Sequence, residues 1–187
     1  VDAGTTTLQG AFSGWGTLTK SGAGTLKLVG TSSYSGTTTV LAGTLQGDTS
    51  TLRGSINNQA QVVFDQDTDG SFTGVISNTG TVTKRGSGVV TFDANQSYEG
   101  GTTVAGGTLR LGTGATLSTN GSLTVNAGTF DLNGNNQTVS ALAGTGGTVA
   151  LGSGTLTVDQ ATNTSYAGVI TGSGAFVKEG TGTLTLT

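Results

Sequence analysis

The sequence predicts an all-β protein, a parallel β-solenoid, on three observations. A segment at 80–112 repeats an earlier one at 16–47, and a truncated third copy begins at residue 174. Apolar residues alternate with polar ones over short runs, which is the pattern of strands with one buried face. Glycine recurs every few residues, where a chain of short strands must turn. Repetition of this kind is typical of stacked coils.

Composition supports an ordered chain that forms one unit. The 187 residues include 35 Gly, 9% charged residues, and no Pro, Cys, Met or His. An apolar fraction of 33% with regular Val and Leu spacing argues against a disordered linker. We therefore predict a single segment over 1–187. Because the pattern runs into both Val1 and Thr187, we expect it to be excised from a longer chain.

Charge and residue usage exclude several classes of function. The net charge is −3 and the seven basic residues are scattered, so we expect no nucleic-acid partner. The absence of Cys excludes disulfides and thiol chemistry. No apolar run approaches the ~20 residues of a membrane-spanning helix, and the pattern at residues 1–11 is not the one expected of a signal peptide.

The copies keep a strict register. Lys20, Lys84 and Lys178 correspond, at offsets of 64 and 94 residues. Positions predicted to face inward stay apolar in every copy, whereas Thr, Lys and Val exchange freely at those predicted to face outward. The inward positions are Leu18, Leu26 and Leu28 in the first copy, Val82, Val90 and Phe92 in the second, and Phe176, Leu184 and Leu186 in the third.

These correspondences define three repeat units, at about 12–47, 72–112 and 166–187, of which the last is truncated. The first unit is about four residues shorter than the second before its lysine. The stretches between units have the same strand-and-glycine texture, and 63–77 matches 157–171 at the offset of 94.

The repeated elements are short strands, since helical periodicity and helix caps are missing. Strands of about five residues with turns of two to four give coils of about twenty residues. On the order of eight or nine coils, ~4.8 Å apart, make a rod roughly 40 Å long. A β-sandwich is the alternative, but it would not need one face pattern to recur in register. Open sheet edges at the ends of such a rod predict end-to-end self-association.

The units GTLKLVGTSSYSGTTTVLAGTL and GVVTFDANQSYEGGTTVAGGTL resemble the passenger-associated transport repeat of bacterial autotransporters. The stretches FTGVISNTGTVTKRGSG and YAGVITGSGAFVKEGTG resemble its usual flanks. Gly-Thr-Leu, Tyr-x-Gly and Thr-Thr-Val occur twice in fixed order. The resemblance covers nearly the whole chain and is weakest over 1–11 and 113–145.

This resemblance implies a right-handed parallel β-helix on the cell surface, anchored to a Gram-negative outer membrane. It also implies a partner in the same chain, a C-terminal membrane barrel that exports the passenger. We interpret the segment as a non-enzymatic, structural or adhesive stalk. The alternatives are a module that itself binds a glycan, a host cell or a bacterial cell, and a β-helical enzyme acting on polysaccharides.

One stretch has the composition of a cation site. Asp65, Asp67 and Asp69, followed by Gly70, spell the opening of a calcium loop, in which alternating carboxylates converge on the ion. The twelfth position of that motif is Ile76, where an EF-hand places a bidentate Glu. The three aspartates are therefore a candidate partial calcium loop, and a solvated acidic loop is the interpretation that we favour. We expect no other cofactor.

Residues for catalysis are scarce. With no His or Cys and no serine in a G-x-S-x-G turn, an assisted nucleophile has no obvious base. A glycosidase needs two carboxylates facing each other across a cleft. Outside the acidic loop the carboxylates are scattered, and Asp131 and Asp159 occupy positions predicted to face outward. We therefore predict that the segment is not an enzyme.

Threonine pairs invite comparison with ice-binding solenoids, which carry flat threonine ladders. Thr17 and Thr19 begin such a series, but their equivalents in the last unit are Ala175 and Val177, so the ladder is broken. The preference of threonine for strands explains the pairs more simply.

Three aromatic residues stand out. Tyr34 and Tyr98 recur in register, which predicts a structural role inside the stack. Trp15 occurs once, and we predict that it partly caps the core, although an exposed tryptophan could stack on a sugar.

Overall fold

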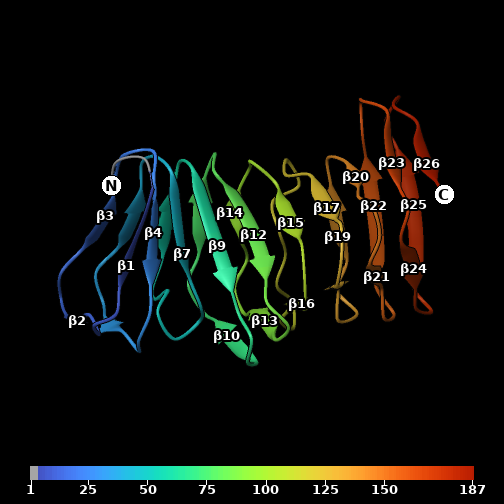
Figure 1. The fold of residues 1–187 in the computed structure, drawn as a ribbon. Coiled ribbons are helices and arrows are strands. Elements are labelled where there is room, and N and C mark those ends of the chain that lie inside the picture. Colours follow the sequence, from blue (N-terminus) through green and yellow to red (C-terminus); the bar gives the residue numbers. More distant parts are fainter. Residues whose placement is uncertain (1–3) are drawn as a thin grey trace.

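The computed structural model describes residues 4–187 as a parallel β-solenoid of about nine turns, with no helix in that range. The coils stack from the N-terminal end to the C-terminal end of a rod (Figure 1). The predicted segment starts at residue 1, and residues 1–3 lie outside the described residues. Every strand pair in the described part is parallel, which confirms the solenoid and excludes the sandwich.

Each coil contributes to three faces, taken in the same order along the chain. Face one is an eight-stranded sheet, and a bridge between Gly144 and Tyr166 leads from it to two further strands. Its strands are β1 (Thr5–Leu8), β4 (Thr25–Leu28), β7 (Thr44–Gly47), β9 (Gln61–Asp65), β12 (Thr81–Arg85), β15 (Thr102–Val104), β17 (Leu123–Val125) and β20 (Leu142–Ala143), then β23 (Thr164–Tyr166) and β26 (Leu184–Leu186).

Faces two and three are each built of two sheets. Face two contains β2 (Ser13–Gly14) and β5 (Ser33–Tyr34), then β10 (Gly70–Phe72), β13 (Val89–Phe92), β16 (Thr108–Leu111), β18 (Thr129–Asp131), β21 (Thr148–Ala150) and β24 (Val169–Thr171). Face three contains β3 (Leu18–Lys20), β6 (Thr38–Val40), β8 (Ile56–Asn58), β11 (Ile76–Asn78) and β14 (Ser97–Tyr98), then β19 (Gln137–Val139), β22 (Thr155–Asp159) and β25 (Ala175–Glu179).

Irregular segments bridge the two breaks. On face two, the segment 48–55 lies between β5 and β10, and the Ser50 carbonyl accepts a bond from the Ser32 amide. On face three, the segment 112–122 lies between β14 and β19. There the Leu117 amide donates to the Gln137 side chain at 2.7 Å. The coil therefore continues through both breaks, although the strand ladder does not.

The inner sides of the three faces enclose one continuous apolar column. Leu26 is 6% exposed and Val90 is fully buried, while Leu184 in the last unit is half-buried. The rings of Phe64, Phe72 and Phe92 meet edge to face with centroids 5.3–5.9 Å apart. Coils that cannot bury their own apolar residues are thus buried by their neighbours.

Corresponding residues of the repeats lie on different faces. Lys20 is on β3 of face three, Lys84 on β12 of face one, and Lys178 on β25 of face three. For Lys178 the cause is that the third unit begins on face one, with β23. For Lys20 it is the shorter first unit, because β11 of the second unit has no counterpart in it. The first unit therefore reaches its lysine one face earlier. Threonines that correspond in sequence accordingly cannot form a single ladder on the rod.

Lysine was predicted at outward positions, and two of the three aligned lysines lie inside instead. Lys20 and Lys84 are 1% and 0% exposed. Each lies two residues after an inward Leu18 or Val82, so strand alternation directs it inward as well. Lys27, one residue after the buried Leu26, faces outward as expected.

Candidate functional site

The three aspartates of the predicted calcium loop lie along one corner of the rod between β9 and β10. The Asp65 carboxylate accepts a bond from the Gln46 side chain at 2.7 Å and lies 3.8 Å from the Lys27 ammonium. Asp67 and Asp69 instead accept backbone amides of the following coil, from Ser87 at 3.1 Å and Val89 at 2.9 Å. The carboxylates thus join neighbouring coils.

The structure gives these carboxylates partners other than a metal ion. Across residues 4–187, no cluster of three His, Cys, Asp or Glu side chains is arranged to hold a metal. Asp69 corresponds at the offset of 94 to Asn163, which accepts the Thr183 amide at 2.8 Å in the same way. Because a neutral amide makes the same contact, the contact itself requires no negative charge. The calcium site stays a prediction of the sequence.

Substitutions at Asp69 separate its role as a hydrogen-bond acceptor from a role as a calcium ligand. Asparagine is expected to preserve stability to within about 0.5 kcal/mol, since its oxygen can still accept the Val89 amide. Alanine removes that acceptor and is expected to cost about 0.5–1.5 kcal/mol. Denaturant unfolding with and without added calcium measures both effects. Stabilisation of the natural sequence by calcium, lost in the Asp69→Asn variant, would instead establish the metal site.

A polar hollow of about 210 Å³ lies beside this corner, lined in part by Lys27, Asp48, Asp65 and Asp67. Its carboxylates are already engaged in structural contacts. One oxygen of Asp48 accepts the backbone amides of Ser50 and Thr51, at 2.9 and 3.0 Å. Asp65 is bound as described above. The arrangement offers no pair of free carboxylates for acid–base chemistry across the hollow.

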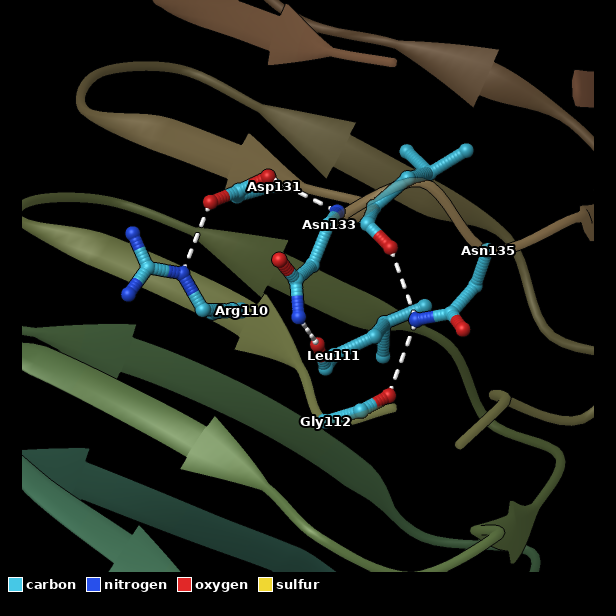
Figure 2. A network of polar contacts seen from close by, with 7 residues as sticks. Arg110, Leu111, Gly112, Asp131, Asn133 and Asn135 are labelled. Carbon is cyan, nitrogen blue, oxygen red and sulfur yellow. Dashed lines mark hydrogen bonds and ion pairs between the residues drawn. The ribbon is translucent and has the colours of Figure 1, made fainter. Parts of the chain in front are cut away.

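A second polar cluster lies on the outside of the rod near β16 and β18 (Figure 2). The Arg110 guanidinium donates to the Asp131 carboxylate at 2.8 Å, and the other Asp131 oxygen accepts the Asn133 amide at 2.8 Å. The Asn133 and Asn135 side chains donate to the carbonyls of Leu111 and Gly112 in the preceding coil, at 3.1 and 2.8 Å. This network also fastens one coil to the next.

The buried lysines hold backbone carbonyls together inside the rod, a role that was not predicted from the sequence. The Lys20 ammonium donates to the carbonyls of Gly22 at 2.6 Å and Ala42 at 2.7 Å. The Lys84 ammonium donates to those of Gly86 at 3.0 Å and Gly106 at 3.2 Å. Their shared spacing from an inward apolar residue was the signal that could have revealed them.

Burial has an electrostatic effect on both lysines. It lowers the pKa of Lys20 and of Lys84, because water no longer solvates the ammonium. At Lys84 the nearby Asp67 and Asp65 carboxylates oppose this shift. Within the described residues the ion pairs are Lys27–Asp65 and Arg110–Asp131, so the buried ammonium groups bind carbonyl oxygens rather than carboxylates.

The recurring tyrosines also lie in the core, which agrees with the structural role predicted for them. The Tyr34 and Tyr98 hydroxyls pair with those of Thr38 and Thr102, at 2.7 and 2.6 Å. Each pair spans the corner that the Tyr-x-Gly motif turns. Burial raises the pKa of the Tyr98 phenol, and the Thr102 bond only partly opposes the shift.

This pKa shift predicts a loss of stability in alkali. In the unfolded chain the Tyr98 phenol ionises above about pH 10, whereas in the folded chain it stays protonated. The free energy of unfolding is therefore expected to fall above pH 10, by up to about 1.4 kcal/mol per pH unit from this group. Denaturant unfolding at several pH values checks it. The stability difference between the natural sequence and Tyr98→Phe should narrow above pH 10; a constant difference would contradict the assignment.

The prediction for Trp15 is wrong. The side chain is 91% exposed and does not cap the core. It lies in the corner between β2 and β3, where Gly14 and Gly16 flank it and offer no side chain to cover it.

Stacked coils, a single apolar column and polar corners that join successive coils define a repeat-built β-solenoid rod. The sequence model of the passenger-associated-transport-repeat family matches residues 18–46, 82–111 and 176–187. These matches fall inside the three predicted units. No solved structure matches the chain, and no helix in the described part could cross a membrane.

A curated relative agrees with the family match. The chain is 40% identical over 150 residues to the adhesin BmaC autotransporter of Brucella suis biovar 1 (strain 1330). The aligned region is 75% of this chain and 4% of that protein. The family match and this relative together support an autotransporter passenger domain that carries the transport repeat.

Proposed function

We propose that this segment is a stalk within a surface-exposed autotransporter passenger, which supports export and presents an adhesive surface. The observation that carries the proposal is the uninterrupted apolar column through all described coils. The longest connection between strands runs over 112–122, so no connection exceeds the ~12 residues above which loops commonly form lids or binding sites. Such a rod is suited to support and spacing.

Export makes specific demands that this chain meets. A passenger crosses the membrane unfolded and folds outside, so a fold built from nearby contacts is favourable. Here strands pair about one coil apart, as Thr25 does with Thr5 and Thr44, and coils can add one at a time to a folded end. The absence of Cys removes cross-links that would obstruct passage.

The proposed location follows from the family. The passenger would lie outside the outer membrane of a Gram-negative cell, joined to a C-terminal translocator of the same chain. The relative's name identifies it as an adhesin autotransporter. Adhesion is accordingly the proposed activity of the whole passenger, and spacing is the proposed contribution of this segment.

Surface display of the full-length protein tests the stalk. Val90→Asp is expected to reduce the amount of passenger accessible on intact cells at least several-fold, because the coils around it cannot fold outside. The outward-facing Thr91→Asp is the matched control and should be displayed normally. Normal display of the Val90→Asp variant would contradict a role in export.

The exposure of Trp15 favours a second candidate, direct binding of a glycan or cell surface by one corner of the rod. A stalk predicts that Trp15→Ala leaves both display and adhesion unchanged. Lost adhesion with normal display would assign the binding function to this segment itself.

A further inference from the structure

The buried lysines lie in two cages that share three contacts. In each, the ammonium donates to the carbonyls one, two and 22 positions further along the chain. For Lys20 these belong to Ser21, Gly22 and Ala42. For Lys84 they belong to Arg85, Gly86 and Gly106, with a longer contact of 3.4 Å to Gln66. The cages lie on different faces of the rod, so the repeat itself builds them.

The backbone around each cage leaves room for an ammonium group and little else. Gly43 and Gly107 pass over the cages with φ angles of 69° and 59°, and a Cβ on them would lie 2.6 and 2.7 Å from the lysine nitrogen. The same Cβ atoms would lie within 2.5 Å of the Gly22 and Gly86 carbonyl oxygens. A planar guanidinium would not suit oxygens gathered around one nitrogen.

We propose that each complete transport repeat contains a structural site for a monovalent cation, formed by backbone carbonyls and filled by the repeat's own lysine ammonium. The ligand class is a primary ammonium ion. The converging oxygens are the negative ends of peptide dipoles, and the ammonium is a donor that all of them share, although the Arg85 carbonyl also accepts the Gln66 amide at 3.0 Å. Removing the cation would take this donor from partly buried oxygens. The positive charge is thus required by the corner, whereas the alkyl chain serves to tether it.

The cage also explains how one coil is joined to the next. Two of its carbonyls come from the lysine's own corner, and the third comes from the corner one coil further on. Because that third carbonyl belongs to the next coil, a complete cage joins two stacked coils and couples their folding.

Chemical modification can change the charge while keeping the length of the side chain. The chain has no cysteine, so Lys84→Cys introduces a unique thiol. In denaturant, its thiolate displaces bromide from 2-bromoethylamine to give a thioether that ends in an ammonium group. The same displacement on 1-bromopropane gives a neutral thioether of equal length. Both products are then refolded and melted at neutral pH.

The aminoethylated protein is expected to melt within ~2 °C of the natural sequence, and the propylated protein about 5–15 °C lower. The same two modifications of Lys27→Cys, at a position that faces outward, should differ by less than ~2 °C. Equal melting temperatures for the two products at position 84 would overturn the proposal and leave Lys84 a packing residue. Failure of the propylated protein alone to refold would support it.

A second measurement uses a free ligand. Lys84→Ala removes the three carbons and the nitrogen that n-propylammonium supplies. This ion is expected to raise the melting temperature of the variant more than sodium at the same ionic strength, and more than neutral 1-propanol. The natural sequence should show no such preference. Equal responses to the three additives in the variant would contradict a cation site.

Discussion

Val90→Asp is expected to unfold the central coils of the rod. Val90 is fully buried, and on face two it lies between Gly70 and Leu109 in register. An aspartate there would place a carboxylate in the apolar column, so either a charge is buried or the coil opens. The cost is expected to be about 4 kcal/mol or more, a large part of the stability of an ordinary domain.

Thermal unfolding followed by circular dichroism measures this loss, with Thr91→Asp as the control on the adjacent outward position. The control is expected to shift the melting temperature by no more than ~2 °C. A Val90→Asp protein that melts within a few degrees of the natural sequence would contradict the placement of this strand.

Gly144→Ala is expected to have the second largest effect. Gly144 forms the bridge to Tyr166 on face one and has a φ of 149°, which L-residues rarely adopt. A Cβ at this position would lie 1.8 Å from the Val125 carbonyl oxygen of the preceding coil. Strain and displacement of that coil together are expected to cost about 2–5 kcal/mol.

Gly16→Ala is the matched control, because a Cβ at Gly16 has nothing within 4 Å and φ lies outside the left-handed region. Comparison of the two variants by denaturant unfolding separates close approach between coils from the general effect of replacing a glycine. Equal stability of the two variants would mean that the coils are not packed as closely at Gly144 as described.

The sequence predicted the solenoid, its coil length and its apolar column because these depend on local alternation. Leu26 and Val90 are buried because they occupy the apolar positions of alternating strands, as predicted. The face of the rod on which the lysine of each repeat lies was not predictable from the repeat itself. It depends on how many strands precede the lysine, and the four residues missing from the first unit shift Lys20 by one face relative to Lys84.

The candidate sites were harder to predict because the same residue type serves opposite roles. Asp69 has the spacing of a calcium ligand, yet its contact is the one that the neutral Asn163 makes in another coil. Lys84 is charged, and lysine was predicted at outward positions, yet carbonyl oxygens from corners one coil apart make a buried position favourable. Contacts of this kind appear only once the coil length places residues 22 positions apart side by side.

Paired cysteines test most directly the claim that coils, and not sequence repeats, are the stacked units. Thr103 and Thr124 are outward-facing register partners on β15 and β17, and neighbouring strands lie at a spacing that a disulfide can bridge. Thr39 corresponds to Thr103 in the repeat but lies on β6 of face three. The account predicts that Thr103→Cys/Thr124→Cys forms an intramolecular disulfide in the folded chain and Thr39→Cys/Thr103→Cys does not. The reverse result would contradict it.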